Sequence, residues 1–277
     1  IHGSGNTEEM LATEPEDRPL GVQLLGSDSD TMQKALESLQ SYSPALIDLN
    51  AACPVPKITK KGKGASLLKT PHKLHELLKG MVRHSHVPVT VKIRSGWDET
   101  STNAVDVARY AQDAGIHALF IHGRTREQGY RGRVDYRIIK EVKTALQIPV
   151  IASGDALSPH LIKRLFDETG CDGVSIARGA LGNPWIFREA MDFLENGRLP
   201  ERPSGGEVAR TMTYHLELFC DFYGEKHGTM LFRKFFGWYA TGIPHMNYLR
   251  DMAFRAATKE RMVELIACLL AGDRTVS

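Results

Sequence analysis

The sequence predicts an α/β fold followed by an all-helical region. Short apolar stretches of strand length alternate with longer stretches in which apolar residues recur at helical spacing. This alternation is typical of a parallel sheet, because each helix carries the chain back to begin the next strand in the same direction. The alternation stops in a loop-like segment rich in proline and glycine near Gly197–Gly206. We therefore expect two domains, a β-α domain over residues 1–196 and a helical domain over residues 207–277.

Each element is predicted by its own run of residues. Thr70 and Ser158 each precede a proline, so we expect their hydroxyls to cap helices that begin at Pro71 and Pro159. The predicted strands are Leu20–Leu25, Ala45–Leu49, Val87–Ile93, Ala118–His122, Ile148–Ala152 and Gly173–Ala177. The predicted helices are Asp30–Gln40, Thr70–His84, Thr102–Ala114, Tyr136–Leu146 and Pro159–Asp167, with later helical stripes at Val208–Tyr223 and Met262–Leu270.

Composition and charge argue against several classes of protein. The net charge of +2, from 35 basic and 33 acidic residues, does not suit a protein that coats nucleic acid by bulk charge, although it allows a local basic patch. No apolar run approaches the roughly 18 residues that a membrane span needs. The cysteines form no C-x-x-C pair, which favours a reducing cytoplasm over a zinc site or a disulfide framework. We expect a cytoplasmic monomer that binds no metal and no membrane.

The polar candidate residues lie at the C-terminal ends of the predicted strands. In a parallel barrel these ends converge on one face, where loops build the active site, whereas residues with a structural role would be spread along both ends. A single such residue could simply face water from a loop, but the repeated placement favours a barrel over a doubly wound sheet. The residues are Gln23, Asn50 with Cys53, Lys92 with Arg94, His122 with Arg124, Ser153-Gly154-Asp155, and Arg178-Gly179.

Three of these residues could carry chemistry. Cys53 directly follows an apolar strand, and a free thiol, with a pKa of roughly 8.5, can donate a proton at neutral pH or act as a nucleophile. Lys92 lies within an apolar strand and needs an anionic or acceptor partner unless it reaches solvent. His122 could bind a cofactor ring or a substrate carbonyl, or be a satisfied core imidazole.

Glycines and lysines mark the loops. The loops Ser153–Asp155 and Ala177–Pro184 follow the last two strands, where barrels commonly bind phosphate through backbone amides, although their glycines could simply form turns. The segment Gly62–Gly64 lacks the third glycine of a dinucleotide loop and does not follow a strand, so we reject that reading. A basic patch next to Cys53 could attract phosphate or be a solvated loop; it comprises Lys57, Lys60, Lys61 and Lys63.

The ordered motifs of the chain resemble those of bacterial-type tRNA-dihydrouridine synthases. They are Gln23, Asn50-x-x-Cys53-Pro54, Lys92-Ile93-Arg94-x-Gly96-Trp97, His122-Gly123-Arg124-Thr125-Arg126, Gly154-Asp155 and Pro184-Trp185-Ile186-Phe187. The resemblance implies a TIM (β/α)8 barrel that binds FMN, followed by a helical domain that helps to hold tRNA. It also implies reduction of the C5–C6 double bond of tRNA uridines with electrons from NADPH, while Cys53 protonates the uracil carbon.

The resemblance further implies which residues bind the cofactor and the substrate. Gln23, Lys92 and His122 would contact the flavin ring, and its phosphate would be held by Ser153, Gly154, Asp155, Ala177 and Arg178. A uridine in folded RNA would have to turn outward to reach the barrel mouth. The substrate-binding residues would be Asn50, Lys57, Lys60, Lys61, Arg94, Arg124 and Arg126.

The chain also departs from the pattern of this family. Ala51-Ala52 stands where the family usually has Met or Leu followed by Gly, and Ser153 stands where it usually has Asn. Ile1 is not an initiator Met, and the Ala-Pro-Met segment that lies against the flavin is absent. We therefore expect the first barrel strands to be missing from this chain, which would leave an open barrel edge.

Two other functions remain open at this point. An FMN-dependent dihydroorotate or dihydropyrimidine dehydrogenase would act on a free base, but the lysine-rich loop and the helical region favour RNA. An RNA-binding protein whose barrel has lost catalysis would not need Cys53 and Lys92, which are both present. The sequence does not indicate which uridine would be reduced.

Overall fold

The computed structural model describes residues 5–241 and 247–271, which form two compact units that are described separately. The first unit comprises the described residues up to Ala156 together with Arg164–Ile176. The second comprises Leu157–Lys163 together with the described residues from Ala177 onward.

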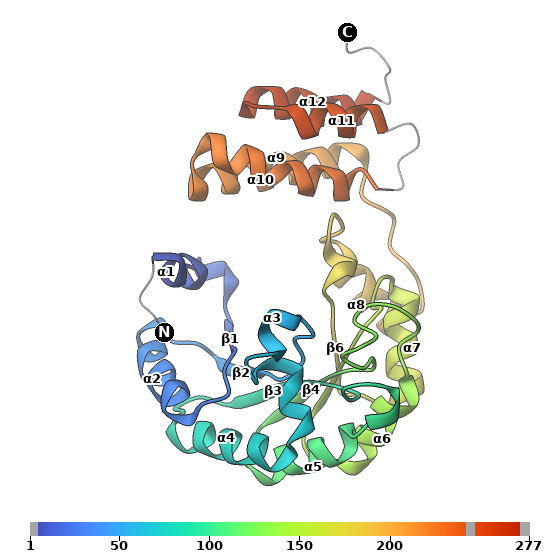
Figure 1. Ribbon diagram of the computed structural model, residues 1–277. Coiled ribbons are helices and arrows are strands. Elements are labelled where there is room, and N and C mark those ends of the chain that lie inside the picture. Colours follow the sequence, from blue (N-terminus) through green and yellow to red (C-terminus); the bar gives the residue numbers. More distant parts are fainter. Residues whose placement is uncertain (1–4, 242–246, 272–277) are drawn as a thin grey trace. The chain divides into compact units, whose positions relative to one another are not determined.

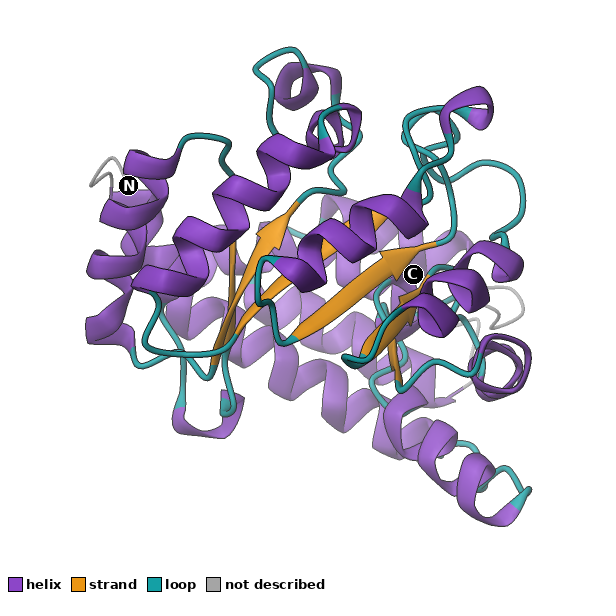
Figure 2. Ribbon diagram, turned by 90° about the horizontal axis from the view of Figure 1, so that it is seen from below, coloured by secondary structure: helices purple, strands orange, loops and turns teal. Residues whose placement is uncertain are grey.

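The first unit is built on a six-stranded sheet in which the strands follow one another in sequence order. Every neighbouring pair is parallel. The sheet curls into a half-barrel with helices around it, as Figures 1 and 2 show. The predicted TIM-barrel-like α/β fold is thus confirmed. The strands are β1 Gly21–Leu24, β2 Leu46–Asn50, β3 Val89–Arg94, β4 Ala118–His122, β5 Val150–Ser153 and β6 Gly173–Ser175.

Helices between the strands begin close to where the sequence predicts. Ser158 caps α7, since its hydroxyl accepts a hydrogen bond from the Leu161 N–H at 3.3 Å. The same prediction was wrong for Thr70: α4 begins at Pro71, but the Thr70 hydroxyl makes no capping hydrogen bond. Its ψ of 72° departs from the extended backbone that is usual at a cap. The α-helices of this region are α1 Gly5–Leu11, α2 Ser29–Leu39, α3 Pro56–Thr59, α4 Pro71–His84, α5 Ala104–Asp113, α6 Tyr136–Ala145 and α7 Pro159–Thr169.

The two faces of the sheet differ in chemistry. One face is apolar, and Leu49, Val91 and Leu119 on it are completely buried. Residues of the opposite parity point to the other face, because side chains alternate along a strand. Strands of a parallel sheet that are buried on both faces usually read as continuous apolar runs. On this face the Thr90 row continues with Ala118, and the Lys92 row continues with the apolar Phe120 and Ile151. The polar part of the inner face therefore lies over β1 to β3 and at the ends of β4 and β5, and it indicates a surface prepared for something other than a hydrophobic core. Its polar rows are Gln23 with Asp48 and Thr90, Asn50 with Lys92, and Arg94 with His122 and Ser153.

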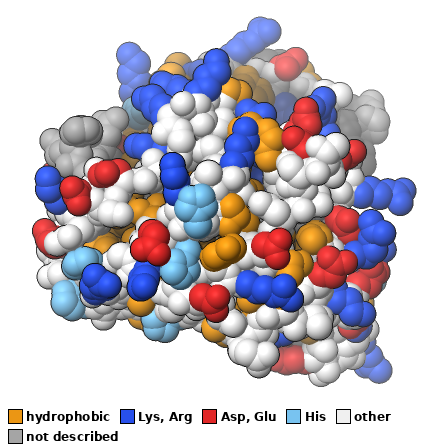
Figure 3. All heavy atoms as spheres, turned by 60° about the horizontal axis from the view of Figure 1, so that its bottom comes forward, with side chains coloured by type: hydrophobic (Ala, Val, Ile, Leu, Met, Phe, Trp, Pro, Cys, Tyr) orange, Lys and Arg blue, Asp and Glu red, His pale blue; other side chains and the backbone are white. Residues whose placement is uncertain are grey.

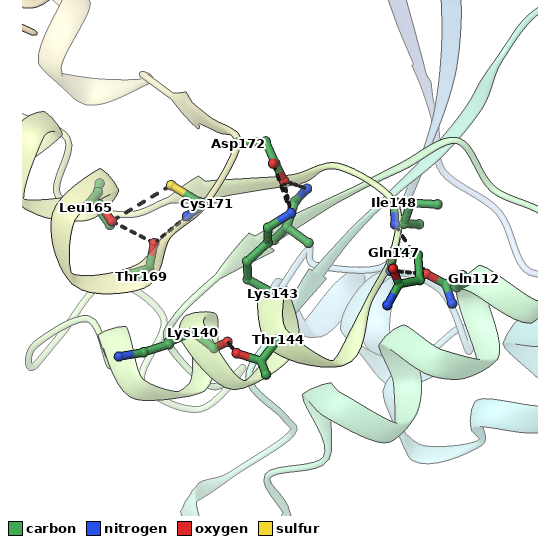
Figure 4. Close-up of polar contacts among 11 residues, drawn as sticks. Gln112, Lys140, Lys143, Thr144, Gln147, Ile148, Leu165, Thr169, Cys171 and Asp172 are labelled. Carbon is green, nitrogen blue, oxygen red and sulfur yellow. Dashed lines mark hydrogen bonds and ion pairs between the residues drawn. The ribbon is translucent and has the colours of Figure 1, made fainter.

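Polar side chains at the amino-terminal edge of the sheet tie strands to helices (Figure 4). Asp172, just before β6, accepts a hydrogen bond from the Val150 N–H at 2.7 Å and pairs with Lys143 of α6 at 2.7 Å. The side-chain oxygen of Gln112 in α5 accepts a hydrogen bond from the Gln147 N–H at 2.7 Å. These contacts satisfy backbone groups of the segments that lead into the strands.

The second unit is helical. Gly224 joins the two longest of its described helices, and apolar residues such as Met212, Phe232 and Leu265 form its core. The helices are α8 Ile186–Asn196, α9 Gly205–Tyr223, α10 Glu225–Tyr239, α11 Asn247–Arg255 and α12 Lys259–Ala271. The predicted helical C-terminal region is therefore confirmed. Among the described residues, no helix is both long enough and apolar enough to cross a membrane.

Candidate active site

Cys53 lies on the loop after β2, and Asn50 at the end of that strand shapes the turn. The Asn50 Oδ1 accepts hydrogen bonds from the N–H groups of Ala52 at 3.0 Å and Cys53 at 2.9 Å. Such a bond from an asparagine to the backbone that follows it mimics a backbone turn. The Cys53 side chain is half-buried. Asn50, which was predicted to bind substrate, thus uses its carbonyl group to present the thiol.

The carbonyl groups of the Cys53 loop are held by three other segments. The oxygens of residues 52–54 accept hydrogen bonds, in chain order, from Arg94 Nε at 2.8 Å, the Ala65 N–H at 3.0 Å and Arg126 Nε at 3.1 Å. These donors come from β3, from the 3-10 helix Gly64–Lys69 and from the loop after β4. The surrounding fold therefore fixes the backbone on both sides of Cys53.

Gly64 allows this close packing. Its φ is +61°, and a Cβ at this position would lie 2.8 Å from the Cys53 carbonyl oxygen and 2.9 Å from the Cys53 Cβ. Only glycine adopts this conformation without strain and leaves room for the cysteine. The contact with Cys53 accounts for this glycine without a bound dinucleotide.

A chain of hydrogen bonds crosses the inner face of the sheet. Asn50 Nδ2 donates to Gln23 Oε1 at 2.7 Å, and Gln23 Nε2 donates to Asp48 Oδ2 at 2.7 Å. The Thr90 hydroxyl donates to the other carboxylate oxygen of Asp48, also at 2.7 Å. Sequence reasoning missed Asp48. The available signal was a charged residue within the apolar segment Ile47–Leu49.

Burial shifts the protonation of Asp48 and Lys92 toward neutral forms. The pKa of Asp48 is raised by burial, against the hydrogen bonds from Thr90 and Gln23 and the charge of Lys92. The pKa of Lys92 is lowered by burial, against the attraction of Asp48, while Arg94 lowers it further. The sequence predicted that Lys92 needs an anionic or acceptor partner. Asp48 supplies this negative charge, but its attraction only partly offsets burial, which is the larger effect on the pKa of Lys92.

Arg94 is almost completely buried, with 2% of its surface exposed. In addition to its bond to the Cys53 loop, its Nη1 donates to the carbonyl oxygens of Thr125 at 3.0 Å and Gly129 at 2.8 Å. Its guanidinium group therefore joins the Cys53 loop to the loop after β4. Arg94 was also predicted to bind substrate, and that role stays a prediction beside these contacts within the protein.

His122 ends β4 and is buried. Burial lowers its pKa to about 3, and the charges of Arg94, Arg124 and Lys92 act in the same direction. The imidazole is therefore neutral at physiological pH and can donate or accept a hydrogen bond. Gly154, with a φ of +112°, lets the next loop approach the ring, since a Cβ there would lie 2.7 Å from His122 Cδ2.

Arg124 binds Asp155 in a two-pronged ion pair. Its Nη1 and Nη2 donate to the Asp155 carboxylate at 3.0 Å and 2.6 Å, and the Arg124 side chain is only 3% exposed. Arg124 also donates to the carbonyl oxygens of Arg131 and Gly132. A carboxylate would repel a phosphate, so this pairing neutralises the acidic residue of the predicted phosphate-binding segment Ser153–Asp155.

The remaining predicted residues lie in different places. The buried hydroxyl of Ser153 donates to the Ile121 carbonyl oxygen at 3.1 Å. Ala177 and Arg178 are exposed residues of the second unit, where Arg178 begins a 3-10 helix. Within the described ranges, no group of three or more His, Cys, Asp or Glu residues could hold a metal ion. The lysines of α3 and the turn after it are exposed: Lys57, Lys60 and Lys61.

The family model and the curated relatives agree on one family. A family model described as dihydrouridine synthase matches residues 1–271. The tRNA-dihydrouridine synthase B of Xanthomonas campestris pv. campestris is 41% identical over 254 residues, which cover 92% of this chain and 76% of that protein. The synthase B of Pseudomonas aeruginosa is 40% identical, with 88% and 74% covered. The probable tRNA-dihydrouridine synthase 1 of Synechocystis sp. is 36% identical, with 96% and 75% covered. The chain therefore belongs to the dihydrouridine synthase family of enzymes, as its motifs predicted.

Proposed function

We propose that this enzyme reduces the C5–C6 double bond of uridines in tRNA and so forms 5,6-dihydrouridine. Membership of the family supports the class of reaction, and the names of the relatives support tRNA as the substrate. The observation that carries the proposal is the placement of Cys53. Its half-buried thiol stands on a firmly held loop at the carboxyl edge of a sheet whose inner face is polar.

The residues of the inner face suit FMN as the cofactor. Lys92 is a cation whose pKa burial has lowered, so an acceptor edge of a bound ring would stabilise its charged form. The neutral His122 can add one hydrogen bond, and Gln23 borders the same face. When bound and reduced by NADPH, FMN supplies a hydride to one carbon of the C5–C6 bond. We assign its phosphate to the segment Ser153–Asp155, where Asp155 would contribute backbone groups because its carboxylate is bound by Arg124.

Cys53 supplies the proton for the other carbon in this proposal. A free thiol is mostly protonated at neutral pH, which suits a general acid. Asn50 orients the thiol by holding the N–H groups of the turn, and Arg94 holds the preceding carbonyl. Proton transfer leaves a thiolate on Sγ, and the half-buried position gives solvent a way to protonate it again.

The tRNA contacts are assigned to a local basic surface. Acidic and basic side chains are interspersed on the face drawn in Figure 3, in keeping with the net charge of +2. Attraction of RNA must therefore be local, and we assign it to the exposed Lys57, Lys60 and Lys61 beside the Cys53 loop. Arg94 and Arg124 support the loops from within. The uridine has to leave its stack to reach the thiol. We expect the enzyme to act as a monomer in the cytoplasm.

The test is the conversion itself. The flavin-loaded protein is incubated with NADPH and tRNA that lacks dihydrouridine, and the nucleosides are quantified by mass spectrometry beside a Cys53→Ala variant. We expect dihydrouridine with the wild type, and a loss of about 10² to 10⁴ in rate with the variant, the range for a general acid. Reduction of a free pyrimidine but not of tRNA would contradict the proposal and favour a free-base dehydrogenase.

A further inference from the structure

Arg126 reaches the Cys53 loop from the loop after β4. Its Nε donates to the Pro54 carbonyl oxygen at 3.1 Å. Pro54 directly follows Cys53 and has no N–H group, so this carbonyl is its one backbone group that can form a hydrogen bond. Arg126 was predicted to contact RNA, but its guanidinium group already binds the loop that carries the thiol.

Trp97, in the loop after β3, holds that guanidinium group in place. The Arg126 Cζ lies 4.5 Å from the centroid of the Trp97 ring, within the ~6 Å range of cation–π attraction. Lys69, at the end of the 3-10 helix that packs on Cys53, places its Nζ 3.5 Å from the same centroid. One indole ring therefore links three segments that surround the Cys53 loop.

Backbone hydrogen bonds bring Trp97 and Arg126 together. The Arg126 N–H donates to the Gly96 carbonyl oxygen at 2.9 Å, and the Glu127 N–H donates to the Trp97 carbonyl oxygen at 3.0 Å. Backbone hydrogen bonds thus join the two loops independently of their side chains. The guanidinium group is held in position by a rigid support, as precise placement of a reactive group requires.

We propose that Arg126 is a positioning residue for Cys53, which holds the Pro54 carbonyl in place while it rests on the Trp97 ring. The inference rests on the proposed function, in which Cys53 is the proton donor. Lysine cannot replace Arg126, because it lacks both the Nε donor and the planar group that stacks on the ring. The loss of this contact should misalign the thiol and leave the binding of tRNA intact.

The test uses two readouts on single-residue variants of this protein. The first is the rate of Cys53 alkylation by iodoacetamide without tRNA, located by mass spectrometry, with Cys268 of the helical unit as the internal reference. The second is the separation of kcat from KM for dihydrouridine formation. The variants are Arg126→Lys, Arg126→Met and Trp97→Phe. Arg133→Met is the matched control, because it removes an exposed cation from the same loop.

We expect both Arg126 variants to alter the alkylation rate of Cys53 but not that of Cys268. We also expect kcat to fall about tenfold to a hundredfold with KM nearly unchanged, as small misplacements of a reactive group do. Trp97→Phe should act in the same direction but less strongly, and Arg133→Met should leave both readouts unchanged. If Arg126→Met does not fold, Arg126→Lys, which keeps the charge and much of the length, still tests whether Arg126 positions Cys53.

A higher KM with unchanged kcat and unchanged alkylation would overturn the inference and make Arg126 an RNA contact. If the wild type forms no dihydrouridine, the proposed function fails. The alkylation rates still test whether Arg126 positions Cys53. An unchanged Cys53 rate in both Arg126 variants would then overturn the positioning role, and a changed rate would support it.

Discussion

The two edges of the sheet use an aspartate beside a lysine in opposite ways. At the amino-terminal edge, the hydrogen bonds from Lys143 and Val150 lower the pKa of the partly exposed Asp172. Toward the carboxyl edge, within β2 and β3, burial raises the pKa of Asp48 and lowers that of Lys92. Asp172 is paired directly with Lys143, whereas Asp48 is buried and accepts from Gln23 and Thr90, so the difference arises from burial and from the choice of hydrogen-bond partner. One edge stabilises the fold, whereas the other holds charges away from their usual protonation, as binding sites do.

The largest effect is expected for His122 at the carboxyl edge, in the pH dependence of the free energy of unfolding. Its pKa is about 3 in the folded protein against the ordinary 6.5, so the folded state binds fewer protons than the unfolded state between these values. Stability should therefore fall as the pH drops from 6.5 toward 3, by up to about 5 kcal/mol from this residue. Urea unfolding at a series of pH values measures the loss, and His122→Gln should show a smaller one. An imidazole that titrates near 6.5 by NMR would contradict the prediction.

A matched pair of lysine variants compares the edges directly. Lys92→Met should lower dihydrouridine formation by at least about a hundredfold and weaken flavin retention, because it removes a preorganised charge from the inner face. Lys143→Met should keep both activities and cost about 1 kcal/mol of stability, since its ion pair is partly exposed. Bound flavin after gel filtration and the rate of reduction are the measurements. Equal losses of activity in the two variants would contradict the prediction that Lys92 has a role in function and Lys143 a role in stability.

Alanine variants of two glycines can distinguish the effect of backbone strain from the effect of displacing the Cys53 thiol. Gly64→Ala and Gly62→Ala both place alanine at positive φ, which costs roughly 1–2 kcal/mol. Only at Gly64 would the new Cβ meet Cys53, whereas at Gly62 the nearest atom is 4.0 Å away. We expect turnover to fall about tenfold to a hundredfold for Gly64→Ala alone. Similar turnover in the two variants at equal protein stability would show that the Cys53 loop tolerates the shift.

The smallest effect is expected at the amino-terminal edge. Asp172→Asn should destabilise the protein by about 1 kcal/mol at neutral pH, because it removes a partly exposed charge pair. The folded pKa of Asp172 lies below its ordinary 3.8, so the contribution is present above that value and is lost as the pH falls through the folded pKa. The difference in unfolding free energy between wild type and variant should therefore vanish in strong acid. A difference that persists there would assign the effect to packing.

The sequence predicted the architecture well because periodicity and strand ends are local signals. Each predicted strand overlaps an observed one, and the polar residues of β2 to β5 lie at the carboxyl edge as expected. The cap at Thr70 could not be predicted in the same way. Its failure depends on one backbone angle, which the residue type does not determine.

The contacts of individual site residues within the protein were harder to predict, because they depend on partners far away in sequence. Arg94 and Arg124 bind carbonyl oxygens of loops and one carboxylate, whose positions follow only from the folded loops. Their contacts with substrate stay predictions. Asp48 was missed for a related reason, since its bond to Gln23 becomes visible only when the register of β1 and β2 is known.

The hydrogen-bond chain across the inner face has a fixed direction. Because Asn50 Oδ1 accepts from two backbone N–H groups, its amide nitrogen must point to Gln23. Gln23 must then receive with its oxygen and donate with its nitrogen to Asp48. The main chain at the cysteine thus dictates which way a side-chain amide on a different strand is turned. A change as small as Asn50→Asp, which removes one donor, would free that amide to rotate and would erase the order of donors and acceptors that a ligand meets there.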